Sequence, residues 1–168
     1  MRSQPRVWLV LIGVIILAAS LAACNSSTIK TSKTPLPTPT TGPIQLTVDR
    51  AVYTSTQPIG VTITNTTKTD FYSMSGRSGC TFLQLQQYNQ KQNTWVSVDP
   101  CDSIDQPSVR KIPASVAVPF TLAPGTIPAI SPNIWPTGIY RVALQYSPQS
   151  DAISSLQIAY SQGFQIKA

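Results

Sequence analysis

Three cysteines have the most distinctive chemistry in this sequence, and no histidine accompanies them. Without histidine, the chain lacks the Ser–His–Asp and Cys–His arrangements of nucleophilic catalysis and the zinc sites that use an imidazole ligand. Cys80 and Cys101 also lack the C-x-x-C spacing of redox pairs and metal sites. They flank a predicted hairpin, and antiparallel pairing brings the two ends of a hairpin close together. In an exported chain we therefore expect a structural disulfide between them.

Other candidates for catalysis or metal binding are weak. Asp99, Asp102 and Asp105 lie in one loop and offer oxygen ligands to calcium, but the central glycine and closing glutamate of an EF-hand are missing. Solvated turn residues are the alternative that we favour. The glycines form no phosphate loop, and no particular Ser–Lys pair stands out as a nucleophile. We expect no enzyme activity, no cofactor and no metal site.

Aromatic side chains offer a different chemistry, a stacking surface for sugars or peptides. Packing in a hydrophobic core is the alternative for each of them. Trp135 is the strongest candidate for ligand contact because it lies in a loop rich in Pro and Gly, and Trp95 is the second. The loop Ser73–Gly79 is a further possible contact surface or a simple connector. The full set of aromatic candidates is Tyr53, Tyr72, Tyr88, Trp95, Trp135 and Tyr160.

The first residues predict export. Arg2 and Arg6 precede an uncharged apolar run, residues 7–19, which small residues follow. This is the layout of a secretory signal peptide. The tetrad Leu21-Ala22-Ala23-Cys24 resembles the lipobox of bacterial lipoproteins, which implies that residues 1–23 form a cleaved signal helix. The resemblance also implies that the Cys24 thiol carries a diacylglycerol on the extracytoplasmic side of the cell membrane. An uncleaved transmembrane helix is the alternative.

Residues 24–43 are expected to be the lipidated cysteine and a disordered, flexible linker. From position 25 onward this segment contains six Thr, four Pro and three Ser, too little apolar surface to offset the entropy of ordering. The run Pro35–Pro39 favours an extended polyproline II spacer. Removing Arg2 and Arg6 with the signal leaves a net charge of +4, and the part after the linker carries only +2. We therefore expect no nucleic-acid partner.

Residues 44–168 show the alternation of apolar and polar side chains that is typical of β-strands. A polar loop, residues 89–93, separates two such runs and predicts a hairpin. Pro119 predicts an edge strand or a bulge, and Gly163 predicts a bulge in the last strand. We expect an all-β sandwich of seven to eight antiparallel strands. The expected strands cover residues 44–48, 59–63, 81–88, 94–98, 115–122, 140–147 and 157–166.

Short motifs along this domain resemble a family of bacterial immunoglobulin-like lipoprotein domains. The pattern Gly138-x-Tyr140-x-Val142 looks like a tyrosine corner, in which the phenol bonds to nearby backbone. Val142 stands where immunoglobulin domains have their second cysteine, a departure from antigen-receptor domains. The domain is also similar, more distantly, to the bacterial proteinase-inhibitor sandwich. The motifs are residues 60–65, 95–96, 122–125, 138–142 and 161–166.

The main functional hypothesis is a lipid-anchored, non-catalytic module that presents loops outside the cell membrane to an envelope protein or a glycan. An inhibitor of an extracellular protease and a carbohydrate-binding module are the alternatives, with an accessory subunit of an envelope complex as a further one. The membrane is the expected partner through the lipid anchor at Cys24.

Overall fold

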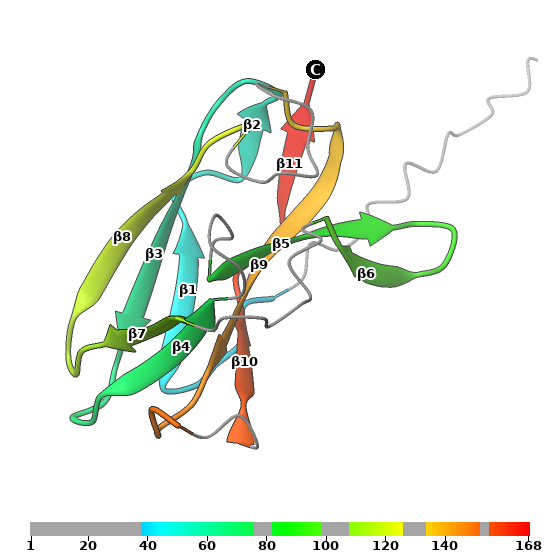
Figure 1. Ribbon diagram of the computed structural model, residues 1–168. Helices are drawn as coiled ribbons and strands as arrows, with labels where there is room; N and C mark the ends of the chain where they lie inside the picture. Colours follow the sequence, from blue (N-terminus) through cyan, green and yellow to red (C-terminus); the bar gives the residue numbers. More distant parts are fainter. Residues whose placement is uncertain (1–37, 76–81, 99–107, 126–133, 152–154) are drawn as a thin grey trace, which may run out of the picture. The chain divides into compact units, whose positions relative to one another are not determined.

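The computed structural model describes residues 38–75, 82–98, 108–125, 134–151 and 155–168. Within these ranges the chain is nearly all β-structure and contains no α-helix, as the alternating side chains predict. Figure 1 labels the strands. They are β1 (Ile44–Val48), β2 (Val52–Thr54), β3 (Ile59–Asn65), β4 (Phe71–Ser75), β5 (Leu83–Asn89), β6 (Thr94–Ser97), β7 (Ser108–Ile112), β8 (Ala117–Leu122), β9 (Gly138–Tyr146), β10 (Gln157–Tyr160) and β11 (Phe164–Lys167).

The strands form three sheets with the orders β1-β3-β8, β2-β11-β9-β5-β6 and β4-β7, and β10 also pairs with β9. Figure 1 shows the hairpin of β5 and β6 extending away from the other strands. Neighbouring strands are antiparallel, except that β2 runs parallel to β11. The expectation of purely antiparallel pairing is therefore wrong at this edge, where the chain places a short early strand beside its last one.

One buried apolar cluster joins side chains from all three sheets. β1 alternates as predicted, with Ile44, Leu46 and Val48 buried and the residues between them exposed. β3 repeats the pattern from Ile59 to Asn65. Because side chains alternate across a strand, each of these strands contributes one face to the core.

The number of strands is larger than predicted. The described residues contain eleven strands rather than seven or eight. β2, β4 and β7 were not expected, since they are short and show no clear alternation. The last predicted strand is divided into β10 and β11.

That division is a β-bulge. Tyr160 lies opposite Ala143 and Phe164 lies opposite Tyr140, so the register on β9 shifts by one residue between β10 and β11. The additional residue lies within Ser161–Gly163. The prediction of a bulge near Gly163 is confirmed. Pro119 lies on β8, which is an edge strand of its sheet. This confirms the prediction of an edge strand or a bulge at Pro119.

The end of the predicted linker is attached to the domain. The backbone N–H of Thr40 donates to the Tyr160 carbonyl at 3.1 Å, and the Thr40 hydroxyl accepts the Tyr160 N–H at 3.1 Å. Thr40 is therefore held beside Tyr160 at the end of β10, although it forms no strand itself. Residues 1–37, with the predicted signal helix and most of the linker, lie outside the described residues.

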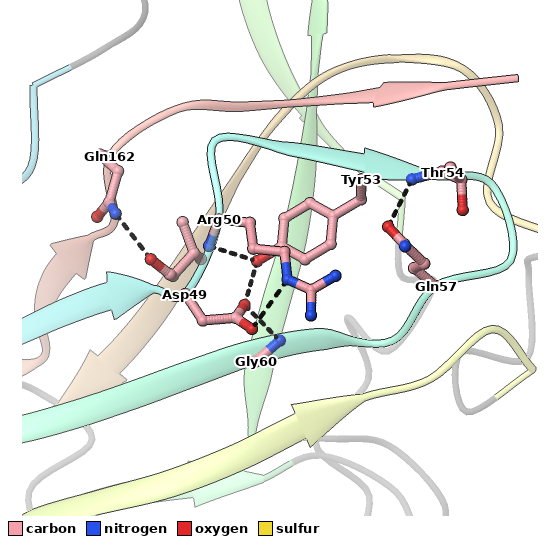
Figure 2. A network of polar contacts seen from close by, with 8 residues as sticks. Asp49, Arg50, Tyr53, Thr54, Gln57, Gly60 and Gln162 are labelled. Carbon is pink, nitrogen blue, oxygen red and sulfur yellow. Dashed lines mark hydrogen bonds and ion pairs between the residues drawn. The ribbon is translucent and has the colours of Figure 1, made fainter.

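A polar network fixes the turn between β1 and β2 (Figure 2). The Tyr53 hydroxyl donates to the Asp49 carboxylate and accepts the Arg50 N–H at 3.2 Å. The same carboxylate accepts the N–H of Gly60 at 3.1 Å. A Cβ at position 60 would lie 2.8 Å from the Asp49 Cγ, so the close approach requires glycine.

Candidate functional site

One face of the largest sheet points away from the core, and we call it the outer face. On β9, Tyr140, Val142 and Leu144 are buried on the core side, so the residues between them project outward. The strand registers then place the outward residues of the neighbouring strands beside them. The outer face consists of Gln84, Gln86, Tyr88, Trp95, Ser97, Ile139, Arg141, Ala143, Gln145, Ile158, Tyr160 and Gln165.

Arg141 is the centre of this face. Its guanidinium carbon lies 4.5 Å from the ring centre of Trp95 and 3.8 Å from that of Tyr160, both within the range of cation–π attraction. Its Nε donates to Gln86 Oε1 at 2.8 Å. The rings come from β6 and β10, on opposite sides of the β5–β9 pair. Trp95 also contacts the ring of Tyr88 at 5.2 Å between centroids.

The charge of Arg141 is not neutralised by any carboxylate of the described residues. The ion pairs found there join Arg50 to Asp49 and Lys111 to Asp70. Partial burial lowers the pKa of Arg141, against an opposing contribution from Tyr160, but the group remains charged at neutral pH because guanidinium is a very weak acid. A partly desolvated cation thus lies between two rings without a described carboxylate as its counter-ion.

Two clefts lie beside Tyr88, one next to the outer-face residues Ile139 and Gln165 and one on the opposite side of the hairpin. One has a volume of about 370 Å³ and is bordered by Tyr88, Gln165 and Lys167. The other, of about 390 Å³, is bordered by Gln87, Val96 and Val98, whose side chains alternate with those of the outer face, so it lies on the other side of the protruding hairpin. Both clefts are open to solvent, so the aromatic cluster has accessible surface at its margin.

The two tryptophans that the sequence predicts to contact a ligand lie in different environments. Trp95 is half-buried on the outer face, in the cluster with Arg141. Trp135 is fully buried, and its Nε1 donates to the Gln57 carbonyl at 2.7 Å. The expectation that Trp135 contacts a ligand is wrong. Trp135 lies against the turn between β2 and β3, where its backbone N–H also donates to the Ser55 carbonyl.

The other aromatic candidates divide in the same way. Tyr88 and Tyr160 belong to the outer face, whereas Tyr53 is buried in the core and Tyr72 lies on β4. The predicted tyrosine corner is confirmed, since the Tyr140 hydroxyl donates to the Pro136 carbonyl at 2.7 Å. Burial raises the pKa of Tyr140 to about 12.

A second arginine lies over aromatic rings elsewhere. Arg110 on β7 lies 4.8 Å from the ring centre of Phe82 and 4.6 Å from that of Phe120. The two rings pack edge to face beside a cavity of about 210 Å³. Arg110 is exposed, and the lining is mostly apolar, so this site lacks the polar side chains that surround Arg141.

Several predicted site residues lie outside the described residues. They are the lipidation site Cys24, the cysteines Cys80 and Cys101, and the acidic loop residues Asp99, Asp102 and Asp105. Among the described residues, no group of three or more acidic, cysteine or histidine side chains is arranged to hold a metal ion. The described part also contains no helix long and apolar enough to cross a membrane.

Arg141 was not predicted as a site residue, although the sequence contains a signal for it. The alternation of residues 140–146 places Arg141 on the outward side of its strand. The sequence did not reveal that β6 and β10 would bring Trp95 and Tyr160 to it, because strand order follows from long-range pairing. Searches for similar proteins gave no further guide: no family model matches the chain, and no curated protein matches it.

Proposed function

We propose that this chain is an exported, lipid-anchored, non-catalytic binding module with an immunoglobulin-like β-sandwich, and that its ligand binds the outer face. The observation that carries the proposal is the position of Arg141 between Trp95 and Tyr160. This differs from the sequence hypothesis in one respect, since the binding surface is a sheet face rather than a set of loops.

The order of the strands supports an immunoglobulin-like sandwich. β1-β3-β8 corresponds to strands A-B-E of that fold, and β11-β9-β5-β6 corresponds to G-F-C-C′. Both sheets contribute to one core. Tyr140 forms its corner near the start of the strand that corresponds to F, where immunoglobulin-like domains have theirs.

The sequence supports the anchor. The lipobox-like Leu21–Cys24 follows an apolar run, and the Pro- and Thr-rich segment after it is a spacer. The two hydrogen bonds between Thr40 and Tyr160 support a domain that begins near the end of this segment. At about 3 Å per residue in polyproline II, it holds the module tens of ångströms from the lipid.

A disulfide between Cys80 and Cys101 is part of the proposal. The ladder of β5 and β6 extends to Val98, whose N–H donates to the Leu85 carbonyl at 3.0 Å. Phe82 and Val98 both pack against the core. They lie two and three residues from the cysteines, so short segments lead to both thiols from neighbouring strands.

Of the alternatives, carbohydrate binding has a specific observation in its favour, the aromatic and amide side chains of the outer face. Protease inhibition has none among the described residues.

Metabolic labelling with palmitate tests the anchor. We expect the label in the membrane fraction of cells that express the wild-type chain and its loss in Cys24→Ser. Cys80→Ser is the matched control and keeps the label. Equal labelling of wild type and Cys24→Ser would overturn the proposed anchor.

A further inference from the structure

We infer that the outer face binds an acidic glycan, a chain of sugar rings that carries carboxylates. This inference rests on the proposed function, because it names the class of ligand for the same face. One juxtaposition carries it: the guanidinium of Arg141 lies against the rings of Trp95 and Tyr160, beside unpaired amides and without a described carboxylate.

The aromatic part of the face suits sugar rings. A sugar ring presents C–H groups on its faces, and these pack on the negative face of an aromatic ring. Trp95, Arg141 and Tyr160 lie on β6, β9 and β10, and only β5 separates β6 from β9. With strands about 4.8 Å apart, this row crosses roughly 14 Å of the sheet. Such an extended row suits a chain of sugars better than a single unit.

The amides supply the polar contacts that sugar hydroxyls need. The side chains of Gln84, Gln145 and Gln165 form no hydrogen bond with any described group. Each is half-buried and offers a donor and an acceptor. A hydroxyl also donates and accepts, so the two groups match. Gln86 has a different role, since its Oε1 accepts a hydrogen bond from the Nε of Arg141.

The charges favour a ligand with carboxylates. Arg141 has five N–H donors, of which one is used by Gln86, and no other hydrogen-bond acceptor pairs with it among the described residues. A free guanidinium edge binds a carboxylate through two parallel hydrogen bonds. Lys167 borders the cleft beside Tyr88, Ile139 and Gln165. No acidic residue lies on the described part of the outer face.

Two other ligand classes fit less well. A nucleic acid requires many phosphate contacts, and this face has only Arg141 and the neighbouring Lys167 among its described cations. An extended peptide is usually bound at a sheet edge or in a groove, through backbone pairing or deep pockets. The outer face presents side chains and shallow, open clefts instead.

The test measures binding of the full lipidated chain, held in detergent micelles, to carboxylated polysaccharides. Polygalacturonate, alginate and hyaluronate are the probes, and methyl-esterified polygalacturonate is the matched neutral polymer. We expect at least one carboxylated polymer to bind, with affinity that falls as salt is raised. For polygalacturonate, esterification is expected to weaken binding about tenfold or more, the effect of losing a charge-assisted pair.

Three variants locate the site. Arg141→Gln and Trp95→Ala should each weaken binding about tenfold, which corresponds to one lost cation or ring contact of about 1.4 kcal/mol. Arg110→Gln is the matched control, because it removes an arginine that also lies over two rings but on β7. Its affinity should equal that of the wild type. Thermal unfolding of each variant verifies that the fold is retained.

The outcomes separate this inference from the proposed function. Failure of all three carboxylated polymers to bind would overturn the glycan inference. Equal binding of the esterified polymer, still lost in Trp95→Ala, would overturn the acidic requirement and leave the outer face as the binding surface. Binding that persists in both Arg141→Gln and Trp95→Ala would overturn the claim that the outer face is the binding surface. The palmitate result at Cys24 is independent of all three.

Discussion

The side-chain hydroxyl of Ser161 accepts the backbone N–H of Val142 at 2.9 Å, in the middle of the bulge that separates β10 from β11. In return, the Ser161 N–H donates to the Val142 carbonyl at 2.9 Å, and the hydroxyl donates to the Gln162 carbonyl at 2.8 Å. One serine thus closes the hydrogen-bond ladder where the bulge displaces the main-chain acceptor. The bulge lies next to Tyr160, so this contact helps to hold the outer face in register.

Ser161→Ala should destabilise the domain by about 1–3 kcal/mol, because it leaves the buried N–H of Val142 without an acceptor. Urea unfolding measures the change. Ser73→Ala is the control, since the Ser73 hydroxyl is equally buried but has no hydrogen-bond partner. That substitution should be neutral or slightly stabilising. Equal losses in both variants would contradict the role given to Ser161.

Much of the fold was predictable because it depends on local patterns. Alternation identified the long strands, residues 89–93 marked the hairpin, and the spacing around Tyr140 marked its corner. The short strands β2, β4 and β7 were missed, since their pairing depends on distant partners.

The candidate site was only partly predictable, for a related reason. A tryptophan in a Pro- and Gly-rich loop is expected to be exposed, yet the Trp135 indole is buried and bonds to Gln57 in the β2–β3 turn. Trp95, the other tryptophan predicted to contact a ligand, lies half-buried on the outer face, and its contact with a ligand stays a prediction. Its partner Arg141 depends on the order of β6, β5, β9 and β10, which no local pattern contains.

Gly60→Ala should destabilise the domain by about 1–3 kcal/mol, the usual effect of overpacking, because the new methyl would lie 2.8 Å from Asp49 Cγ. Gly42→Ala is the control, since its Cβ would meet nothing closer than the Tyr146 hydroxyl at 3.8 Å. Denaturant midpoints of the two variants give the comparison. A stable Gly60→Ala protein would show that the Asp49 contact in Figure 2 is not tight.

Stability should fall at alkaline pH. Burial raises the pKa of Tyr140 to about 12, and burial also raises the pKa of Tyr146 and, with the bond to Asp49, that of Tyr53. In the unfolded chain these phenols ionise near pH 10. The folded state therefore retains protons that the unfolded state has lost. The stabilisation is complete below about pH 10 and is lost as the pH rises through about 12. Unfolding free energies measured across this range should decline, and a constant value would contradict the burial of these phenols.

Trp135→Phe should destabilise the domain by about 2–4 kcal/mol, because it leaves a cavity and removes the bond to the Gln57 carbonyl. Trp95→Phe should change stability by less than about 1 kcal/mol, since Trp95 lies on the outer face. Thermal unfolding of the pair tests the corrected assignment of the two tryptophans. A larger loss of stability in Trp95→Phe than in Trp135→Phe would contradict this assignment.

Reduction of the proposed bond between Cys80 and Cys101 should lower stability by about 3 kcal/mol, the entropy expected for a loop of this length. Mass spectrometry of the non-reduced protein should show the two cysteines in one linked peptide. The Cys80→Ser/Cys101→Ser double variant should have the stability of the reduced protein. Free thiols at both positions in protein isolated from the envelope would contradict the bond.

The most direct test of the central claim, that a lipid on Cys24 holds this binding module outside the cell membrane, is the mass of the N-terminal peptide from membrane-extracted protein. The account predicts a chain that begins at Cys24 and carries a diacylglycerol. A chain that retains residues 1–23, or an unmodified Cys24 in protein recovered from the cytosol, would contradict it.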